Sequence, residues 1–248
     1  MTEHDLIVVD VGNSQCKVGL VQGENIQQVH VLALEDCAYQ PWRQKVVRSL
    51  LSHSVLWVLS GSNPPIIQRF SEWLRNHSQR QKVISSETAL PLQIAVDHPD
   101  RVGRDRLLHA VATPIKPVII ISAGSAVTVD SVDAQGTFQG GAIFPGLRLM
   151  AKSLHDYTAR LPLIDAARKE PPLPGKNTED AMHAGIVSAV VGGIIRCVEQ
   201  MKTPEAGIIL TGGDGPTLTP LLPWTVVQIP WLALQGLVVA SRSLRHEA

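Results

Sequence analysis

The first stretch that could do chemistry is DVGNSQCK, residues 10–17, which follows an apolar, β-branched run predicting a buried strand. Gly12 and Asn13 favour a tight turn, because both residue types tolerate a positive φ. Backbone N–H groups and the Ser14 hydroxyl can donate to phosphate oxygens, and Lys17 adds positive charge. Asp10 can hold a hydrated metal ion. An ordinary hairpin is the alternative interpretation.

The second stretch is DHPDRVGRDRLLHAVA, residues 97–112, where Arg104, Asp105 and Arg106 open a predicted helix. An acidic residue in a first helical turn has a purely structural explanation, since it complements the helix dipole. The flanking arginines allow another: they keep a carboxylate ionised and can bind a carboxylate or phosphate of a ligand. Asp105 is thus a candidate general base for a hydroxyl that attacks a γ-phosphate.

The opening pattern recurs in the second half of the chain, where an apolar run at 118–121 is followed by the small-residue turn SAGS and a β-branched run. A plain hairpin is again the alternative. A third small-residue turn, TGGDGP at 211–216, follows an apolar run and would let a flat ligand such as adenine approach the backbone. Paired phosphate turns are what an internally duplicated kinase needs.

The strands and helices expected around these turns indicate a mixed α/β chain. We expect two domains, 1–115 and 116–248, divided at Lys116-Pro117. In the first half the periodicity gives three strands, a helix, a strand, a helix and a strand. In the second, the glycine-rich segment 138–146 indicates a turn, and Thr178 is the expected N-cap of a helix. Residues 184–198 are so apolar that we expect this helix to be buried on most sides, as at a domain or dimer interface.

The bulk composition excludes several classes of protein. The 248 residues carry a formal net charge of +0 and only 4% aromatic residues, which argues against nucleic-acid and anionic-membrane partners. The three cysteines, Cys16, Cys37 and Cys197, form no metal or disulfide pattern. We find no signal-peptide layout and expect no apolar run approaching ~20 residues. The chain is therefore expected to be cytoplasmic, with no membrane partner.

Six motifs together resemble the type III pantothenate kinase family, also called the Bvg accessory factor family, over essentially the whole chain. They are DVGNSQCKVGL, HPDRVGRDRLLHA, AGSAVTVD, GGAIFPGLRLM, NTEDAMHAGI and LTGGDGP. The resemblance implies an α/β fold of two ribonuclease-H-like domains, the duplicated actin-like ATPase fold, with an active-site cleft between them. It also implies a homodimer that phosphorylates pantothenate to 4'-phosphopantothenate with ATP, the first step of coenzyme A biosynthesis.

The resemblance further implies roles for individual residues. The segment that binds ATP and Mg²⁺ would comprise Asp10, Val11, Gly12, Asn13, Ser14, Gln15, Cys16 and Lys17, with Asp10 nearest the metal and Ser125 as a further ATP contact. The pantothenate-binding segment would comprise Gly103, Arg104, Asp105 and Arg106, with Asp105 as the base. Thr178 would contact pantothenate from the opposite domain or from the partner subunit.

The sequence departs from the family pattern at three positions. Ser125 replaces the ATP-contacting Thr and keeps the hydroxyl, and the other two bear more directly on function. Ser122 stands where family members usually carry the Asp that binds a monovalent cation, K⁺ or NH₄⁺, and a hydroxyl is a weaker ligand than a carboxylate. Val96 stands where a Tyr borders the pantothenate pocket. These departures leave two alternatives open, a non-catalytic or regulatory nucleotide-binding protein and a kinase of another small hydroxy acid.

Overall fold

The computed structural model describes residues 5–34, 42, 44–52, 55–167 and 172–243. Contacts divide the chain into two compact units. Unit 1 is Met1–Leu92 with Asp97–Thr113 and Leu232–Ala248, and unit 2 is Gln93–Val96 with Pro114–Trp231. Cys37 lies outside the described residues.

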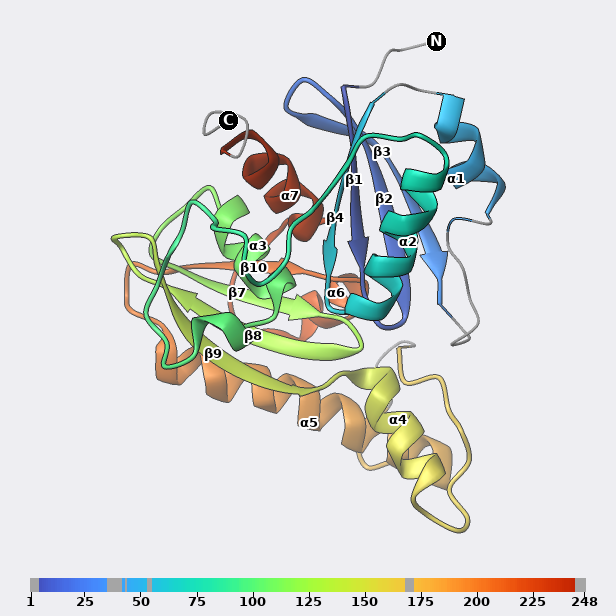
Figure 1. Cartoon of the computed structure of the whole chain (residues 1–248). Coiled ribbons are helices and arrows are strands. Elements are labelled where there is room, and N and C mark those ends of the chain that lie inside the picture. The colour runs from blue at the N-terminus through green and yellow to red at the C-terminus, as the bar shows by residue number, and fades with distance from the viewer. Residues whose placement is uncertain (1–4, 35–41, 43, 53–54, 168–171, 244–248) are drawn as a thin grey trace. The chain divides into compact units, whose positions relative to one another are not determined.

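Unit 1 is a five-stranded sheet flanked by helices (Figure 1). Its elements are β1 (Leu6–Val11), β2 (Gln15–Gln22), β3 (Asn25–Ala33), α1 (Lys45–Ser49), the 3₁₀ turn η2 (Leu50–Ser52), β4 (Leu56–Gly61), α2 (Pro64–Asn76), β5 (Gln81–Val83), the 3₁₀ turn η3 (Pro99–Arg101), α3 (Arg104–Ala112) and α7 (Leu232–Ser243). The strand order is β3-β2-β1-β4-β5, with β1–β2–β3 antiparallel and β4 and β5 parallel to β1. The predicted order of elements in this half is confirmed.

The two faces of the unit 1 sheet have different partners. One face buries Val9, Val18 and Trp57 in a core with Phe70 and Leu74 of α2. Alternate residues point to opposite faces of a strand, so Asp10, Lys17 and Gly19 lie on the other one. This second face meets α7: a Cβ on Gly19 would lie 3.3 Å from Leu234 Cδ1. The same face therefore carries the candidate metal ligand.

Unit 2 is a six-stranded sheet packed on a long helix (Figure 1). Its elements are β6 (Gln93–Ile94), β7 (Val118–Ala123), β8 (Ala126–Val132), β9 (Thr137–Pro145), α4 (Leu147–Asp156), α5 (Thr178–Met201), β10 (Gly207–Thr211), α6 (Gly215–Leu218), the 3₁₀ turn η4 (Thr219–Leu221) and β11 (Val227–Gln228). The strand order is β11-β10-β7-β8-β9-β6. Ile119, Ile121 and Val129 pack with Ile186 and Val190 of α5 in its core.

The strand registers show an internal duplication. In unit 1, Asp10 of β1 is paired with Lys17 of β2 and Ser60 of β4. In unit 2, Ser122 of β7 is paired in the same way with Thr128 of β8 and Thr211 of β10. The glycines that directly follow Ser60 and Thr211 also occupy equivalent positions in the two units. A Cβ on Gly61 or on Gly212 would lie 2.1 Å from the carbonyl oxygen of Val11 or of Ala123, and both glycines have positive φ.

The predicted division at residues 115 and 116 differs from the observed units in two places. Strand β6 belongs to unit 2, because Gln93 and Ile94 pair with β9. Helix α7 belongs to unit 1, because it packs on α3 and β1. There the backbones approach so closely that a Cβ on Gly236 would lie 2.1 Å from the Leu108 carbonyl oxygen.

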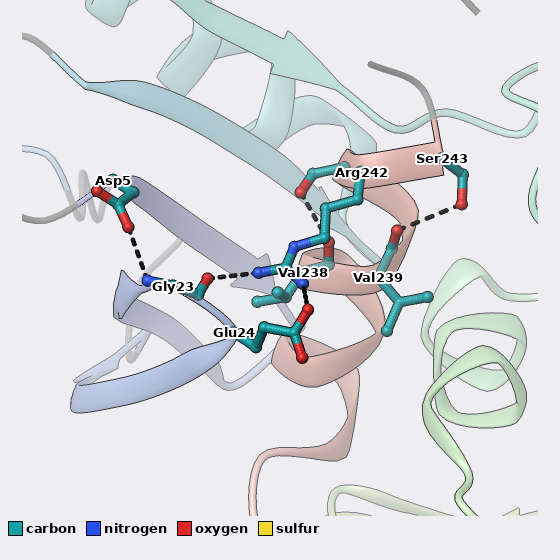
Figure 2. A network of polar contacts seen from close by, with 8 residues as sticks. Asp5, Gly23, Glu24, Val238, Val239, Arg242 and Ser243 are labelled. Carbon is teal, nitrogen blue, oxygen red and sulfur yellow. Dashed lines mark hydrogen bonds and ion pairs between the residues drawn. The ribbon is translucent and has the colours of Figure 1, made fainter. Parts of the chain in front are cut away.

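The end of α7 is tied to the β2–β3 turn of the same unit (Figure 2). Arg242 donates through Nη1 to Glu24 Oε1 and through Nη2 to the Gly23 carbonyl oxygen. The Gly23 N–H donates in turn to Asp5 Oδ2 at 2.7 Å. Gly23 has a φ of 59°, a left-handed backbone conformation that favours glycine.

Two local predictions in unit 2 are wrong. Residues 137–145 form strand β9 rather than a turn, because the glycines serve close approach: a Cβ on Gly141 would lie 2.0 Å from the Val129 carbonyl oxygen. The N-cap of α5 is Asn177, whose Oδ1 accepts the Asp180 N–H at 2.8 Å, so Thr178 is the first helical residue. The cap is shifted because Asn is as good a capping residue as Thr.

Helix α5 corrects two further expectations. It is not buried on most sides, since its most apolar 18-residue window is only 44% buried. Its 24 residues also make it long and apolar enough to cross a bilayer by length and composition, contrary to the expected absence of such a run. Its buried residues pack against the unit 2 sheet, as in the core helix of a globular domain.

Candidate active site

The Asp10–Lys17 segment forms the first candidate site, at the end of β1 in unit 1. Lys17 Nζ lies 3.6 Å from Asp10 Oδ2, and the two side chains are 24% and 8% exposed. Burial raises the pKa of Asp10, the Asp105 charge raises it further, and Lys17 opposes the shift. The carboxylate therefore lies beside one cation, in a setting that favours a second. The turn is closed by the Gly12 N–H, which donates to the Gln15 carbonyl oxygen at 2.9 Å.

Side chains of the turn divide into exposed and buried ones. Asn13 and Ser14 are exposed, and Gly12 and Gln15 are half-buried, so these residues can meet a ligand. Val11 and Cys16 are fully buried in the core, so they can contribute only backbone groups. Burial also raises the pKa of the Cys16 thiol. A thiol in such a place is unreactive.

The second candidate segment, residues 103–106, opens α3 in the same unit. Asp105 is half-buried in the first turn, and a Cβ on Gly103 would lie 2.7 Å from its Oδ1, so a glycine there leaves space for the carboxylate. Arg104 is 9% exposed, and its Nη2 donates to the Thr88 carbonyl oxygen. Burial lowers the pKa of Arg104. Of the two arginines, the half-buried Arg106 is therefore the better placed to bind a ligand.

Unit 1 thus brings the two predicted segments into one electrostatic cluster, to which His109 also belongs. Burial lowers the pKa of His109 to about 4; the Asp105 charge opposes this shift, whereas Lys17 and Arg106 add to it. The sequence reasoning missed His109. Its position four residues after Asp105, on the same side of a predicted helix, is the signal that could have found it.

In unit 2, three hydroxyl side chains lie together at Ser122, the position where the family resemblance implied a monovalent-cation ligand. Ser122 is half-buried and lies in register between Thr128 and Thr211, so the three side chains share one face of the sheet. Thr128 Oγ1 is fully buried and has no hydrogen-bond partner among the described residues. Within the described chain, no group of three or more His, Cys, Asp or Glu residues could hold a metal ion.

The second and third small-residue turns of unit 2 lie against each other. Ser125 is exposed at the β7–β8 turn, and its carbonyl oxygen accepts the Gly146 N–H at 2.9 Å. The Asp214 N–H, in the third turn, donates to the Ala123 carbonyl oxygen at 3.0 Å. Burial raises the pKa of Asp214, and the Arg148 charge opposes the shift. Like His109, Asp214 is a polar residue that the sequence did not mark out.

Thr178 is exposed at the start of α5 and lines an open pocket of about 590 Å³. The other lining residues are Arg160, Pro162, Asn177, Glu179 and Asp180. One cation, two carboxylates and two polar side chains give this pocket a strongly polar lining.

Comparison with known proteins gives consistent matches over most of the chain. A family model described as Type III pantothenate kinase matches residues 6–200. A protein of that name from Porphyromonas gingivalis is 31% identical over 241 residues, covering 93% of this chain and 95% of the relative. Another, from Listeria monocytogenes, is 28% identical over 251 residues and covers 96% of both chains.

Solved structures of more distant proteins share the fold. A protein of Campylobacter jejuni described as a Baf family transcriptional activator has a TM-score of 0.63 at 20% identity, covering 97% of this chain and 99% of that one. The activator of 2-hydroxyisocaproyl-CoA dehydratase from Clostridium difficile, solved with bound ADPNP, has a TM-score of 0.55 at 15% identity, covering 98% and 97%. The predicted duplicated α/β fold class is confirmed.

Proposed function

Because the chain belongs to the type III pantothenate kinase family, we propose that it transfers the γ-phosphoryl group of ATP to the primary hydroxyl of pantothenate. The product is 4'-phosphopantothenate, and the reaction is the first step of coenzyme A biosynthesis. The observation that carries this proposal is the cluster of Asp105 with the Asp10–Lys17 pair in unit 1. Phosphoryl transfer needs mainly positioning and charge stabilisation, and this cluster supplies both.

The proposed roles follow from burial and charge. Asp105, half-buried in the first turn of α3, accepts the proton of the substrate hydroxyl. Arg106 binds the pantothenate carboxylate, since it is half-buried beside Asp105 in the first turn of α3 whereas Arg104 is only 9% exposed. In unit 2, Ser125 donates to ATP and Thr178 to pantothenate, because both hydroxyls are exposed.

A divalent cation fits the carboxylate of Asp10. Mg²⁺ is usually bound through one or two carboxylates together with substrate phosphates and several waters, and a single buried carboxylate at the end of a phosphate-binding turn matches that donor set. When bound, Mg²⁺ supplies charge to the phosphates. The chain's own contribution is Lys17, which lies beside the same carboxylate, and the exposed residues Asn13 and Ser14.

The monovalent cation is a separate matter, because Ser122 is flanked by Thr128 and Thr211 rather than by carboxylates. We propose that K⁺ or NH₄⁺ binds weakly here and that turnover depends little on either. Hydroxyl oxygens carry no net charge, so a cation gains less from them than from a carboxylate.

We also propose that the protein forms a homodimer through the exposed side of α5. We propose further that it is cytoplasmic, because ATP is available there. The exposed positions of α5 include Ala181, Gly185, Ser188 and Gly192, and a Cβ on either glycine would meet no atom within 4 Å. Small residues allow close helix approach. Sedimentation velocity at micromolar concentration should give a dimer, and Gly185→Glu a monomer. A monomeric parent protein would contradict the dimer.

The test of the function is an ADP-release assay with ATP, Mg²⁺ and pantothenate. Turnover that depends on pantothenate supports the proposal. Turnover that appears only with a different hydroxy acid would favour a kinase of another substrate, which Val96 at the predicted pocket edge leaves open. Tight ATP binding without turnover on any hydroxy acid would favour a regulatory nucleotide binder.

A further inference from the structure

His109 is a buried ionisable group near the candidate base that the proposed phosphoryl transfer does not use. It follows Asp105 by four residues on α3, so the two side chains lie on one side of the helix. The imidazole is 6% exposed, and its Nδ1 is fully buried without a hydrogen-bond partner among the described residues. A buried unsatisfied polar atom costs about 1–3 kcal/mol, so a residue of this kind needs a reason to be there.

The charged groups around His109 come from several elements of unit 1. Asp105, Arg104 and Arg106 lie on its own helix, Asp10 on β1 and Lys17 on β2. Of the elements packed against α3, the described part of α7 adds only Arg242, which is bound to Glu24, and β4 adds no ionisable side chain. Burial outweighs the attraction of Asp105, so the imidazole is uncharged at neutral pH.

A neutral imidazole has a different effect on Asp105 from that of a cation or an apolar group. A cation at position 109 would stabilise the ionised carboxylate and weaken it as a proton acceptor. It would also add positive charge next to Lys17 and Arg106. An apolar side chain would remove the buried polar group one helical turn from Asp105.

We propose that His109 is a positioning residue for Asp105: a buried polar side chain one turn further along α3 that fixes the first turn of the helix. This role rests on the proposed function, in which Asp105 accepts the hydroxyl proton. It predicts that the effect of changing His109 on catalysis passes through Asp105.

A double-mutant cycle tests this dependence. In the parent protein, His109→Leu should lower kcat by about tenfold or more with KM for pantothenate changed less than threefold, while His109→Gln should recover most of the loss. In an Asp105→Asn background, His109→Leu should change the residual kcat by less than twofold, since the base is absent.

Leu108→Val is the matched control, because Leu108 is a fully buried neighbour on α3 whose loss loosens packing without changing the polar cluster. It should lower the unfolding temperature but leave kcat within about twofold. An equal fold-loss from His109→Leu in both backgrounds, or no loss in the parent, would overturn the proposal.

A titration without substrate covers the case in which His109→Leu does not fold. The imidazole ¹⁵N signal of His109, assigned by its absence from His109→Gln, should stay that of a neutral ring until below pH 5. In Asp105→Asn its titration midpoint should fall further, because the Asp105 charge raises it; an unchanged midpoint would overturn the proposal. Absence of pantothenate-dependent turnover in the parent would refute the proposed function alone, since this coupling is measured without turnover.

Discussion

Asp10 and Ser122 occupy equivalent positions in two sheets of the same chain, each at the penultimate residue of its strand and in register with a strand on either side. One position carries a buried carboxylate paired with Lys17, and the other a hydroxyl between Thr128 and Thr211. The duplicated backbone therefore carries a carboxylate in unit 1 where unit 2 carries a hydroxyl, while the buried carboxylate of Asp130 lies two residues along β8 from Thr128 on the same sheet face.

Replacing the neutral member of this pair tests the difference. Ser122→Asp should make turnover dependent on K⁺, whereas the parent protein should change less than about twofold when K⁺ replaces Na⁺, because a carboxylate attracts a cation and a hydroxyl carries no charge. Steady-state rates in the two salts at equal ionic strength give the answer. Ser122→Thr is the control, and strong K⁺ dependence of the parent would contradict weak cation binding at Ser122.

Asp105→Asn should lower kcat by roughly 10²-fold or more, the usual scale for a general base, while the fold is kept. Circular dichroism and the unfolding temperature check the fold, and the ADP-release assay checks the rate. Asp100→Asn is the matched control, because Asp100 is an exposed carboxylate in the same segment, and it should leave kcat unchanged. A turnover of Asp105→Asn within twofold of the parent would refute the role of Asp105 as base.

The buried His109 should make unit 1 sensitive to acid. Its pKa is lowered to about 4 in the folded protein from an ordinary value near 6.5, so the unfolded chain binds the proton more tightly. Stability is therefore complete above pH ~6.5 and falls as the pH drops towards 4, by about 2 kcal/mol between pH 7 and pH 5. Urea unfolding at both pH values should show this loss in the parent.

The same comparison in His109→Gln isolates the contribution of the imidazole. Because the amide does not titrate, the difference in unfolding free energy between pH 7 and pH 5 should shrink by about 2 kcal/mol. A pH dependence equal to that of the parent would assign the acid sensitivity to other groups.

Arg242→Ala should destabilise unit 1 by about 1 kcal/mol, because it removes an exposed ion pair to Glu24 together with a charged hydrogen bond to the Gly23 carbonyl oxygen (Figure 2). The expected fall of a few degrees in unfolding temperature can be measured by calorimetry. Lys152→Ala is the control, since Lys152 pairs with Asp156 within the single helix α4 and should have a smaller effect.

The elements that carry the candidate site in unit 1 could be predicted from sequence because they depend on local signals. The apolar run before Asp10, the Gly12-Asn13 turn and the start of α3 at Arg104 all follow from residue type and spacing. The only sequence signal for His109 was its spacing of four residues from Asp105; its lowered pKa could not be predicted, since it arises from burial in the folded unit.

The errors in the prediction have a common physical cause. Glycines at 140 and 141 indicated a turn, whereas Gly141 is required by close packing against β8. Helix α7 was expected in the second half because of its position in the sequence. It instead packs on Leu108 in unit 1, because Gly236 has no side chain and lets the two backbones approach closely. Both depend on contacts between segments that sequence periodicity does not report.

The return of α7 to unit 1 has a consequence for the order in which the protein can fold during synthesis. The sheet face that holds Asp10 and Gly19 is covered by a helix at the far end of the chain, so it stays open on the ribosome until residues 232–243 have emerged. Unit 2, encoded almost entirely by one continuous segment, can form its core earlier. Unit 2 therefore does not depend on residues 232–243, whereas the candidate active-site face of unit 1 cannot be closed before they emerge.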